Sequence, residues 1–261
     1  LLGLLPGPVT LLLPNPAARY PLACGPDTSV LGLRVPRLPP QLAALEAVKL
    51  IKSGMTVGLG TGSTAKYAIL EIGRLIADHK LMDIRGVPTS VASEKLAISV
   101  GIPLMELSAA GGDIAIDGAD EIDPNLELIK GMGGALVREK LVEFNAKKFI
   151  VVADHTKLVP YLGYKTAVPV EIMRWGYRAT INQLATVAHQ LEARLWMADG
   201  EPVVTDNGNY LVSCTVREIL NPRELDAKLR HVPGVISTGL FVGYANVAFV
   251  AGENGVERFS R

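Results

Sequence analysis

The chain has 261 residues, of which 49% are hydrophobic and 20% charged, so it can bury a sizeable core and is not globally disordered. Its 26 basic and 26 acidic residues cancel, and only 5% of residues are aromatic, which argues against a nucleic-acid-binding surface. No apolar run reaches the roughly 18 residues that predict a membrane-spanning helix. Two distant cysteines and four scattered histidines predict neither a disulfide framework nor a metal site.

Residues 1–40 differ in composition from the rest of the chain. They hold nine of the 17 prolines and only one acidic residue, Asp27. Proline at this density disrupts both helix and sheet patterns, so we predict a leader or disordered extension outside the fold. A plastid or mitochondrial transit peptide is the alternative, although such peptides are rich in serine and Ser29 is the only serine here.

The pattern changes from residue 42 onward, where predicted strands alternate with predicted helices. The helices are predicted at 42–51, 65–77, 93–100 and 136–147, and the strands at 55–59, 84–87, 102–104, 113–116 and 149–153. This alternation with short connections predicts an α/β domain built on a largely parallel sheet.

After about residue 165 the predicted elements are shorter. Residues 167–172 resemble an edge strand because they contain a proline, and 180–195 resemble an amphipathic helix. Asn207-Gly208 predicts a hairpin turn between strands 203–205 and 210–215. With a short helix at 225–229 and a strand at 234–236, this predicts a small α+β domain at 166–236, inserted in a domain of residues 41–165 and 237–261.

The segment Gly58-Leu-Gly-Thr-Gly-Ser-Thr-Ala65 lies between a predicted strand and a predicted helix. Glycines let a ligand approach the backbone, and a helix N-terminus attracts phosphate. The hydroxyls of Thr61, Ser63 and Thr64 add possible hydrogen bonds. The segment lacks the lysine of a nucleotide-binding P-loop and the GxGxxG spacing of a dinucleotide site. A phosphate site is therefore favoured, with a tight turn capped by Ser or Thr as the alternative.

A second segment, 116–123, runs from an apolar strand directly into four carboxylates. Ligands of open α/β sheets bind beyond the carboxyl ends of the strands, and clustered like charges raise one another's pKa, which suits acid–base chemistry. The alternatives are a solvated loop with aspartate caps, or a divalent metal site. The spacing of a calcium-binding loop is absent.

Three further features carry possible chemistry. Lys130 precedes the glycine-rich stretch 131–134, which combines a cation with accessible amides and predicts an anion or oxyanion site. Glu139 follows in the next predicted helix, where it is a candidate base. Lys157 follows strand 149–153 and is a candidate phosphate ligand. The alternatives are a flexible loop, an ordinary charged helical turn and a solvated lysine.

Taken in order, these segments resemble the A-type ribose-5-phosphate isomerase family. The resemblance rests on the segments at 58–65, 88–90, 117–124, 128–131, 138–140, 205–209 and 233–235. It covers about residues 42–258 and implies a Rossmann-like domain with a smaller inserted ferredoxin-like domain. It also implies a homodimer or homotetramer, located in the cytoplasm, or in the plastid stroma if residues 1–40 are a transit peptide.

The implied activity is the interconversion of D-ribose 5-phosphate and D-ribulose 5-phosphate in the non-oxidative pentose phosphate pathway, and in the Calvin cycle if plastidic. The resemblance implies neither a metal nor an organic cofactor. Its implied catalytic residues are Glu139, Asp117, Asp120 and Lys130. Its implied substrate-binding residues are Thr61, Gly62, Ser63, Thr64, Asp117, Gly118, Ala119, Asp120, Lys130, Gly131, Met132, Gly133 and Lys157. Met132 departs from the family, which usually has glycine there, and fits only if its φ is negative.

A physical mechanism follows from these assignments. Glu139 would move a proton between C2 and C1, while Lys130 and nearby amides stabilise the enediolate oxygen. Asp117 and Asp120 would bind sugar hydroxyls, and Asp117 would assist ring opening. The phosphate would lie at the 61–64 helix terminus near Lys157. A non-catalytic sugar-phosphate-binding regulator is the principal alternative, and a nucleotide-dependent enzyme is the second.

Overall fold

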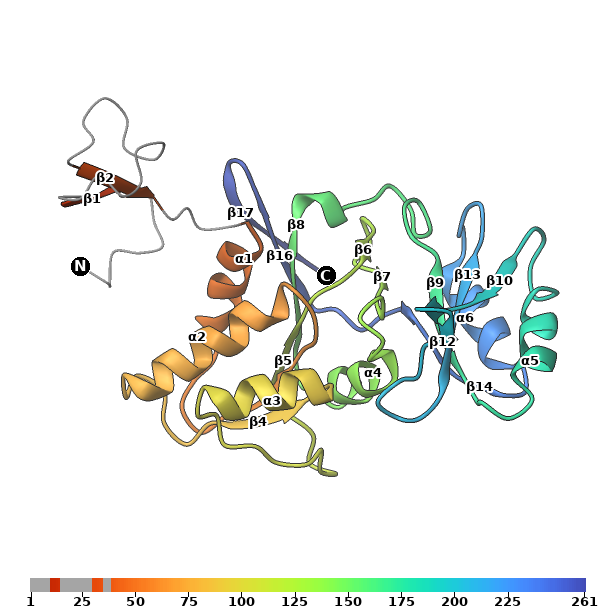
Figure 1. Ribbon diagram of the computed structural model, residues 1–261, viewed down its shortest axis with the longest axis horizontal. Helices are drawn as coiled ribbons and strands as arrows, with labels where there is room; N and C mark the ends of the chain where they lie inside the picture. The colour runs from red at the N-terminus through yellow and green to blue at the C-terminus, as the bar shows by residue number, and fades with distance from the viewer. Residues whose placement is uncertain (1–9, 15–29, 35–38) are drawn as a thin grey trace. The chain divides into compact units, whose positions relative to one another are not determined.

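The computed structural model describes residues 10–14, 30–34 and 39–261, which fall into two separate units, 1–38 and 39–261 (Figure 1). In the first unit, β1 (Thr10–Pro14) pairs antiparallel with β2 (Val30–Arg34). The proline content did not suggest this pairing. The remainder of the predicted leader, up to residue 38, lies outside the described residues.

The second unit is built on a six-stranded sheet with the order β17-β16-β8-β5-β3-β4. All neighbouring strands are parallel except β17, which is antiparallel to β16. The strands are β3 (Thr56–Leu59), β4 (Arg85–Pro88), β5 (Ile114–Asp117), β8 (Phe149–Asp154), β16 (Val247–Gly252) and β17 (Gly255–Ser260). The predicted α/β class with a largely parallel sheet is confirmed.

Helices cover both faces of this sheet, because side chains alternate between the faces along each buried strand. One core joins Ile114 and Ile116 of β5 to α1 (Pro39–Val48), α2 (Ala65–Ala77) and α3 (Val91–Ser99). The opposite core joins Ala115 of β5 to Val142 of α4 (Leu136–Phe144). Helix α4 thus lies on the other face from α1 and α2 (Figure 1).

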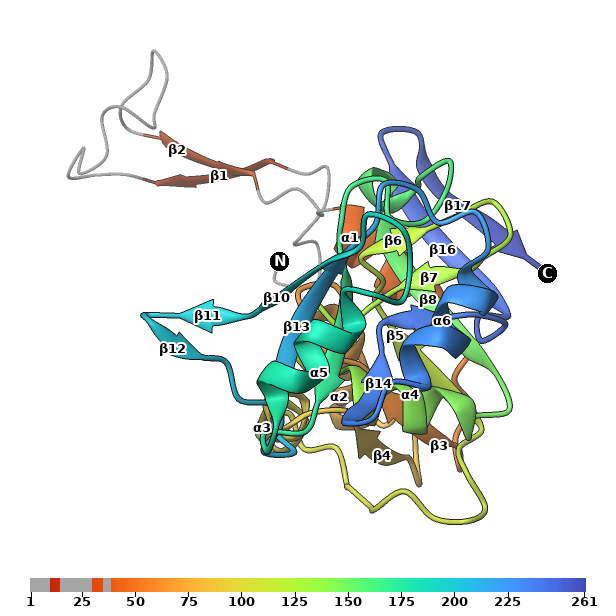
Figure 2. The ribbon, with the colours of Figure 1, turned by 90° about the vertical axis from the view of Figure 1, so that its right-hand side faces the viewer.

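A four-stranded antiparallel sheet has its own core and the order β10-β13-β9-β14. Helices α5 and α6 both contribute leucines to this core. Figure 2 shows the two helices beside the strands of this sheet. The elements are β9 (Val168–Ile172), α5 (Tyr177–Leu184), β10 (Glu192–Leu195), β13 (Tyr210–Thr215), α6 (Pro222–Arg230) and β14 (Val235–Thr238). The division into domains 41–165 plus 237–261 and 166–236 remains a prediction, since residues 39–261 form one compact unit.

Two smaller sheets complete the described structure. One has the order β15-β7-β6 and the other pairs β11 with β12. Their strands are β6 (Glu121–Ile122), β7 (Leu128–Ile129), β11 (Met197–Ala198), β12 (Glu201–Pro202) and β15 (Leu240–Phe241). Among the described helices, none combines the length and apolar character needed to cross a membrane.

Several predicted elements differ from the structure. The helix predicted over 180–195 is wrong beyond Leu184, because Glu192–Leu195 alternate exposed and half-buried residues and pair with β13. Of the strand predicted at 102–104, only a bridge from Leu104 to Gly86 remains. The predicted hairpin strand 203–205 is likewise reduced to one bridge, between Val204 and Tyr210.

The prediction that 167–172 forms an edge strand is also wrong, because β9 lies between β13 and β14. Pro169 is tolerated in this central strand because β14 ends before it. The last residue of β14, Thr238, pairs with Val170, so no residue of β14 lies opposite Pro169. The Pro169 carbonyl instead accepts from the Gly239 amide at 2.6 Å. The missing proline N–H therefore interrupts no ladder.

Candidate active site

The candidate site lies where the parallel strands β3, β5 and β8 end. Since these strands run in the same direction, their following loops gather at one edge of the sheet. They enclose a cavity of about 80 Å³. Its lining residues are Thr61, Gly62, Ser63, Thr64, Gly118, Ala119, Asp120, Lys130, Gly131, Gly133, Glu139 and Lys157. Of the residues predicted for the site, only Asp117 and Met132 are outside this lining.

The 60–64 loop offers backbone amides to this cavity. The Thr61 amide donates to Asp117 Oδ1 at 3.0 Å. Within the described residues, the amides of Gly62, Ser63 and Thr64 donate to no protein acceptor. These groups lie at the N-terminus of the 13-residue helix α2, where an anion is favoured. The Thr64 side chain makes no capping hydrogen bond, so the alternative of a Ser- or Thr-capped turn is not what the structure shows.

The Thr61 hydroxyl faces the protein rather than a ligand. It lies 2.7 Å from the Thr89 hydroxyl, 2.8 Å from that of Ser90 and 3.1 Å from that of Ser93. Ser93 in turn donates to the Gly60 carbonyl at 2.6 Å. This buried hydroxyl cluster fixes the loop, so Thr61 offers the site its backbone, whereas the sequence suggested its hydroxyl.

The four carboxylates of 117–123 accept hydrogen bonds from four separate sets of backbone amides. Asp117 accepts from the Thr61 and Gly118 amides, and Asp120 accepts from the Met132 amide at 3.0 Å. Glu121 accepts from the amides of residues 163, 165 and 166, and Asp123 from those of 125 and 127. Burial, rather than repulsion between neighbours, is the main cause of the raised pKa of Asp120.

Lys130 is the centre of the charged part of the site. It is 2% exposed, and its Nζ donates to the Gly118 carbonyl at 2.7 Å. The same Nζ lies 3.0 Å from Asp117 Oδ2, 3.1 Å from Glu143 Oε1 and 3.6 Å from Glu139 Oε2. Burial alone would lower the pKa of Lys130, but these carboxylates raise it well above its ordinary value. Lys130 is therefore a buried ammonium.

The pKa of the Glu139 carboxyl group lies close to neutral pH. It is 3% exposed on the buried face of α4, yet it lines the cavity. Burial raises its pKa to about 8, against the opposing attraction of Lys130. A carboxylate with a pKa near the working pH is suited to taking up and returning a proton.

Glu143, which was not predicted from the sequence, is 3% exposed and completes the group around Lys130. Burial is also the main cause that raises its pKa well above the ordinary value. The signal was present in the sequence, because Leu136, Glu139 and Glu143 follow helical spacing and must share one face of a helix.

Met132 fits its position without strain. Its side chain is 45% exposed, outside the cavity lining, and its φ is not positive. The positive φ values of this loop fall on Gly131 (104°) and Gly134 (80°), where glycine is needed. A methionine at position 132 was expected to fit only with a negative φ, and the structure agrees with this expectation.

Two side chains of α4, Arg138 and Lys140, hydrogen-bond this helix to the rest of the unit. The Arg138 guanidinium donates to Asn207 Oδ1 at 2.9 Å and to the Asp206 carbonyl at 3.1 Å. Lys140 donates to the Leu240 carbonyl at 2.8 Å and lies over the Phe241 ring. The 205–209 segment, predicted as a hairpin turn and as one of the segments that carry the family resemblance, thus anchors the helix that carries Glu139.

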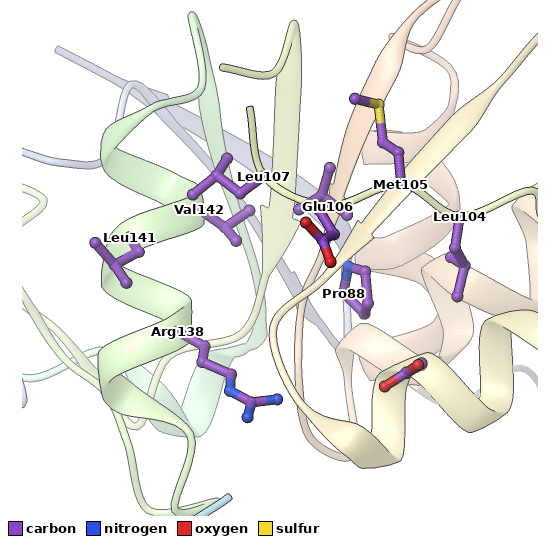
Figure 3. A pocket seen from close by; sticks show the side chains of 10 residues that line it. Pro88, Leu104, Met105, Glu106, Leu107, Arg138, Leu141 and Val142 are labelled. Carbon is purple, nitrogen blue, oxygen red and sulfur yellow. The ribbon is translucent and has the colours of Figure 1, made fainter. Parts of the chain in front are cut away.

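A second hollow, of about 560 Å³, lies against another face of α4 (Figure 3). Leu141 and Val142 form one wall, and Pro88, Leu104 and Met105 are among the residues opposite. Its walls are mainly apolar, and its Arg138 is already bonded to the 206–207 turn. Glu94 and Glu106 also line this hollow, but its lining contains no lysine, so it does not reproduce the paired carboxylate and ammonium of the smaller cavity. In the part of the chain that the structure describes, no group of three or more His, Cys, Asp or Glu could hold a metal ion.

Fold and site together have the features of an α/β enzyme: a small polar cavity at the carboxyl ends of parallel strands, with an acid–base group beside a buried ammonium. Residues 85–255 match the family described as ribose 5-phosphate isomerase A (phosphoriboisomerase A). The Deinococcus radiodurans protein named ribose-5-phosphate isomerase A is 52% identical over 219 residues, covering 84% of this chain and 96% of that protein. The chain belongs to the ribose-5-phosphate isomerase A family.

Other relatives agree with this assignment. An Arabidopsis thaliana protein named probable ribose-5-phosphate isomerase 3, chloroplastic, is 48% identical over 83% of this chain and 81% of its own length. A solved D-ribose-5-phosphate isomerase in complex with phospho-erythronic acid superposes with a TM-score of 0.82 at 41% identity, covering 85% of this chain and 97% of its own. The Plasmodium falciparum enzyme gives 0.83 at 39% identity, with coverages of 85% and 97%.

Proposed function

We propose that this chain interconverts D-ribose 5-phosphate and D-ribulose 5-phosphate, with Glu139 as the base that transfers the proton. The observation that carries the proposal is the placement of Glu139, a nearly buried carboxylate facing a small polar cavity, 3.6 Å from the ammonium of Lys130. One group able to move a proton thus lies beside one able to stabilise negative charge.

The reaction needs a proton taken from C2 of the aldose and returned to C1. Glu139 takes the C2 proton, and the electron pair moves toward the carbonyl oxygen at C1 to form an enediolate. Lys130 offsets the developing negative charge, as an oxyanion-stabilising donor worth on the order of 3 kcal/mol of barrier. Glu139 then returns the proton to C1, and the hydroxyl proton moves from O2 to O1.

Binding is assigned to the loops around this pair. The phosphate lies against the free amides of residues 62–64, with Lys157 as a second contact. Asp120 lines the cavity and binds sugar hydroxyls. Gly118, Ala119, Gly131 and Gly133 contribute backbone to the wall. The related isomerase solved with phospho-erythronic acid supports a phosphorylated sugar-like ligand.

The predicted role of Asp117 in sugar binding and ring opening remains a prediction. Asp117 is 1% exposed and is outside the cavity lining. It accepts two loop amides and pairs with Lys130. These contacts favour a role in joining the phosphate loop to the ammonium. Met132 contributes its amide to Asp120 rather than its side chain to the ligand.

The decisive test measures ketose formation from D-ribose 5-phosphate by the full chain, with a chelator present. We expect turnover, and we expect Glu139→Gln to lower kcat by about 10²–10⁴-fold while KM changes little. Full turnover by Glu139→Gln would exclude the proposed base. Binding of ribose 5-phosphate without any turnover by the unmodified chain would instead support the sugar-phosphate-binding regulator.

Assembly and location are proposed more broadly. We expect a homodimer or homotetramer, which light scattering on the purified chain would measure directly. We propose a cytoplasmic location, consistent with the bacterial and archaeal relatives, with the plastid stroma as the alternative suggested by the chloroplastic relative. Residues 1–40 fused to a fluorescent protein would distinguish the two.

A further inference from the structure

The ammonium of Lys130 has more acceptors than protons to give them. A lysine ammonium has three N–H donors. Its three nearest acceptors are the Gly118 carbonyl at 2.7 Å, Asp117 at 3.0 Å and Glu143 at 3.1 Å. Glu139 is the fourth and most distant, at 3.6 Å. The base of the proposed reaction is thus the carboxylate that lies farthest from the Lys130 ammonium.

Glu143 differs from Glu139 in what it faces. Glu139 lines the cavity, whereas Glu143 does not, although both lie on one face of α4 a single turn apart. Among the described residues, neither oxygen of Glu143 receives a hydrogen bond, and Lys130 is its only ion-pair partner. A carboxylate buried this deeply is costly, so stability gives no reason for its presence.

The surroundings of Glu143 leave Lys130 as its main partner. The charged or titratable groups that act on it or feel its charge are Lys130, Asp117, Glu139, Lys140 and Tyr244. Lys140 is already hydrogen-bonded to the Leu240 carbonyl. The Phe149 and Phe241 rings lie 5.8 and 5.4 Å from the Lys130 Nζ, and an apolar border of this kind strengthens the ion pairs inside it.

We propose that Glu143 is a positioning residue whose charge holds the Lys130 ammonium by an ion pair at 3.1 Å and thereby keeps it from pairing closely with Glu139, which stays free to act as a base. This inference rests on the proposed isomerase function. Without the charge of Glu143, the ammonium moves toward Glu139 and closes the 3.6 Å gap. A tighter ion pair stabilises the charged carboxylate, which makes Glu139 a weaker base.

The test compares Glu143→Gln and Glu143→Leu with the unmodified chain. We expect kcat to fall about tenfold for glutamine, which keeps an acceptor oxygen, and about a hundredfold for leucine, with KM nearly unchanged. We also expect the acidic limb of the kcat/KM profile to move to lower pH, because the base loses its proton more easily. A purely structural role would lower the active fraction at every pH without moving this limb.

Glu121→Gln is the matched control. Glu121 is also a buried carboxylate, but it binds the 163–166 amides and has no ion pair with Lys130. It should change thermal stability without moving the pH limb. A crystal structure of Glu143→Gln should show the Lys130–Glu139 separation shortened from 3.6 Å toward about 2.8 Å.

The inference is overturned if the glutamine variant keeps the kcat, the pH limb and the Lys130–Glu139 distance of the unmodified chain. Because the crystal structure requires only a folded protein, it decides the matter even if the leucine variant fails to fold. An unmodified chain with no isomerase activity would instead refute the proposed function, whatever the Glu143 variants do.

Discussion

At the scale of single residues, the chemistry comes from where carboxylates are placed rather than from how many there are. The sequence shows a run of acids at 117–123, but in the structure each of them binds its own backbone amides. The carboxylate best placed to act as a base is instead Glu139, which comes from α4. Glu139 is buried, near a cation and still open to a cavity, so burial sets its proton affinity while Lys130 limits how far the affinity rises.

The pH dependence of the rate follows from this balance. Glu139 must be ionised to accept a proton, and its pKa in the free protein is raised to about 8. We therefore expect kcat/KM to rise about tenfold per pH unit below this value and to level off above it. Initial rates in a constant-ionic-strength buffer series would measure the limb. A limb near the ordinary glutamate pKa of 4.5 would contradict the structure.

At the scale of secondary-structure elements, α4 links the two larger sheets. Its buried face carries Glu139 and Glu143, while Arg138 reaches the 205–209 turn that follows the small β11–β12 pair. That turn is itself held by Glu171 of β9, which accepts from the Asn209 side chain at 2.8 Å. The orientation of the proposed base thus depends on residues far from it in sequence.

Loss of the hydrogen bonds between Arg138 and the 205–209 turn should reduce catalysis more than substrate binding. We expect Arg138→Met, which keeps much of the side-chain length, to lower kcat about tenfold with a smaller change in KM, since small displacements of a catalytic group are costly. Steady-state kinetics with ribose 5-phosphate would test this. Arg194→Met is the control, because within the described structure Arg194 pairs only with exposed Glu192, so its loss should leave both constants unchanged. Equal losses in the two variants would exclude a specific role for the Arg138 hydrogen bonds.

Local patterns predicted much of both the fold and the candidate site. The strands of the parallel sheet are buried apolar runs, so each loop that follows one could be assigned to the same edge, and the motifs supplied the cavity lining. What failed depends on distant contacts. Leu195 belongs to a strand because of its partner Val212, and the Thr61 hydroxyl turns inward because of Thr89 and Ser93. No window of sequence contains these pairs.

At the scale of the whole molecule, the buried charges oppose stability. Glu139 and Glu143 both have pKa values raised above their ordinary values, so the folded state holds their protons more tightly than the unfolded chain does. The stability that these protonated carboxyls contribute is fully present below about pH 4.5 and is lost as pH rises through the folded pKa, about 8 for Glu139. Their contribution to the free energy of unfolding therefore falls between these values, although other groups add their own dependence.

A comparison of the unmodified chain with Glu139→Gln isolates the contribution of Glu139 ionisation to the free energy of unfolding. Glu139→Gln keeps the shape but cannot ionise, so we expect it to be more stable than the unmodified chain at pH 8 by at least about 1 kcal/mol, with the difference vanishing toward about pH 4. Urea unfolding at the two pH values would measure it. A variant that is less stable at pH 8 would mean that the ion pair with Lys130 outweighs the cost of burial. The expected outcome, a gain in stability with a loss of turnover, would show that the charge at Glu139 costs stability and is required for catalysis.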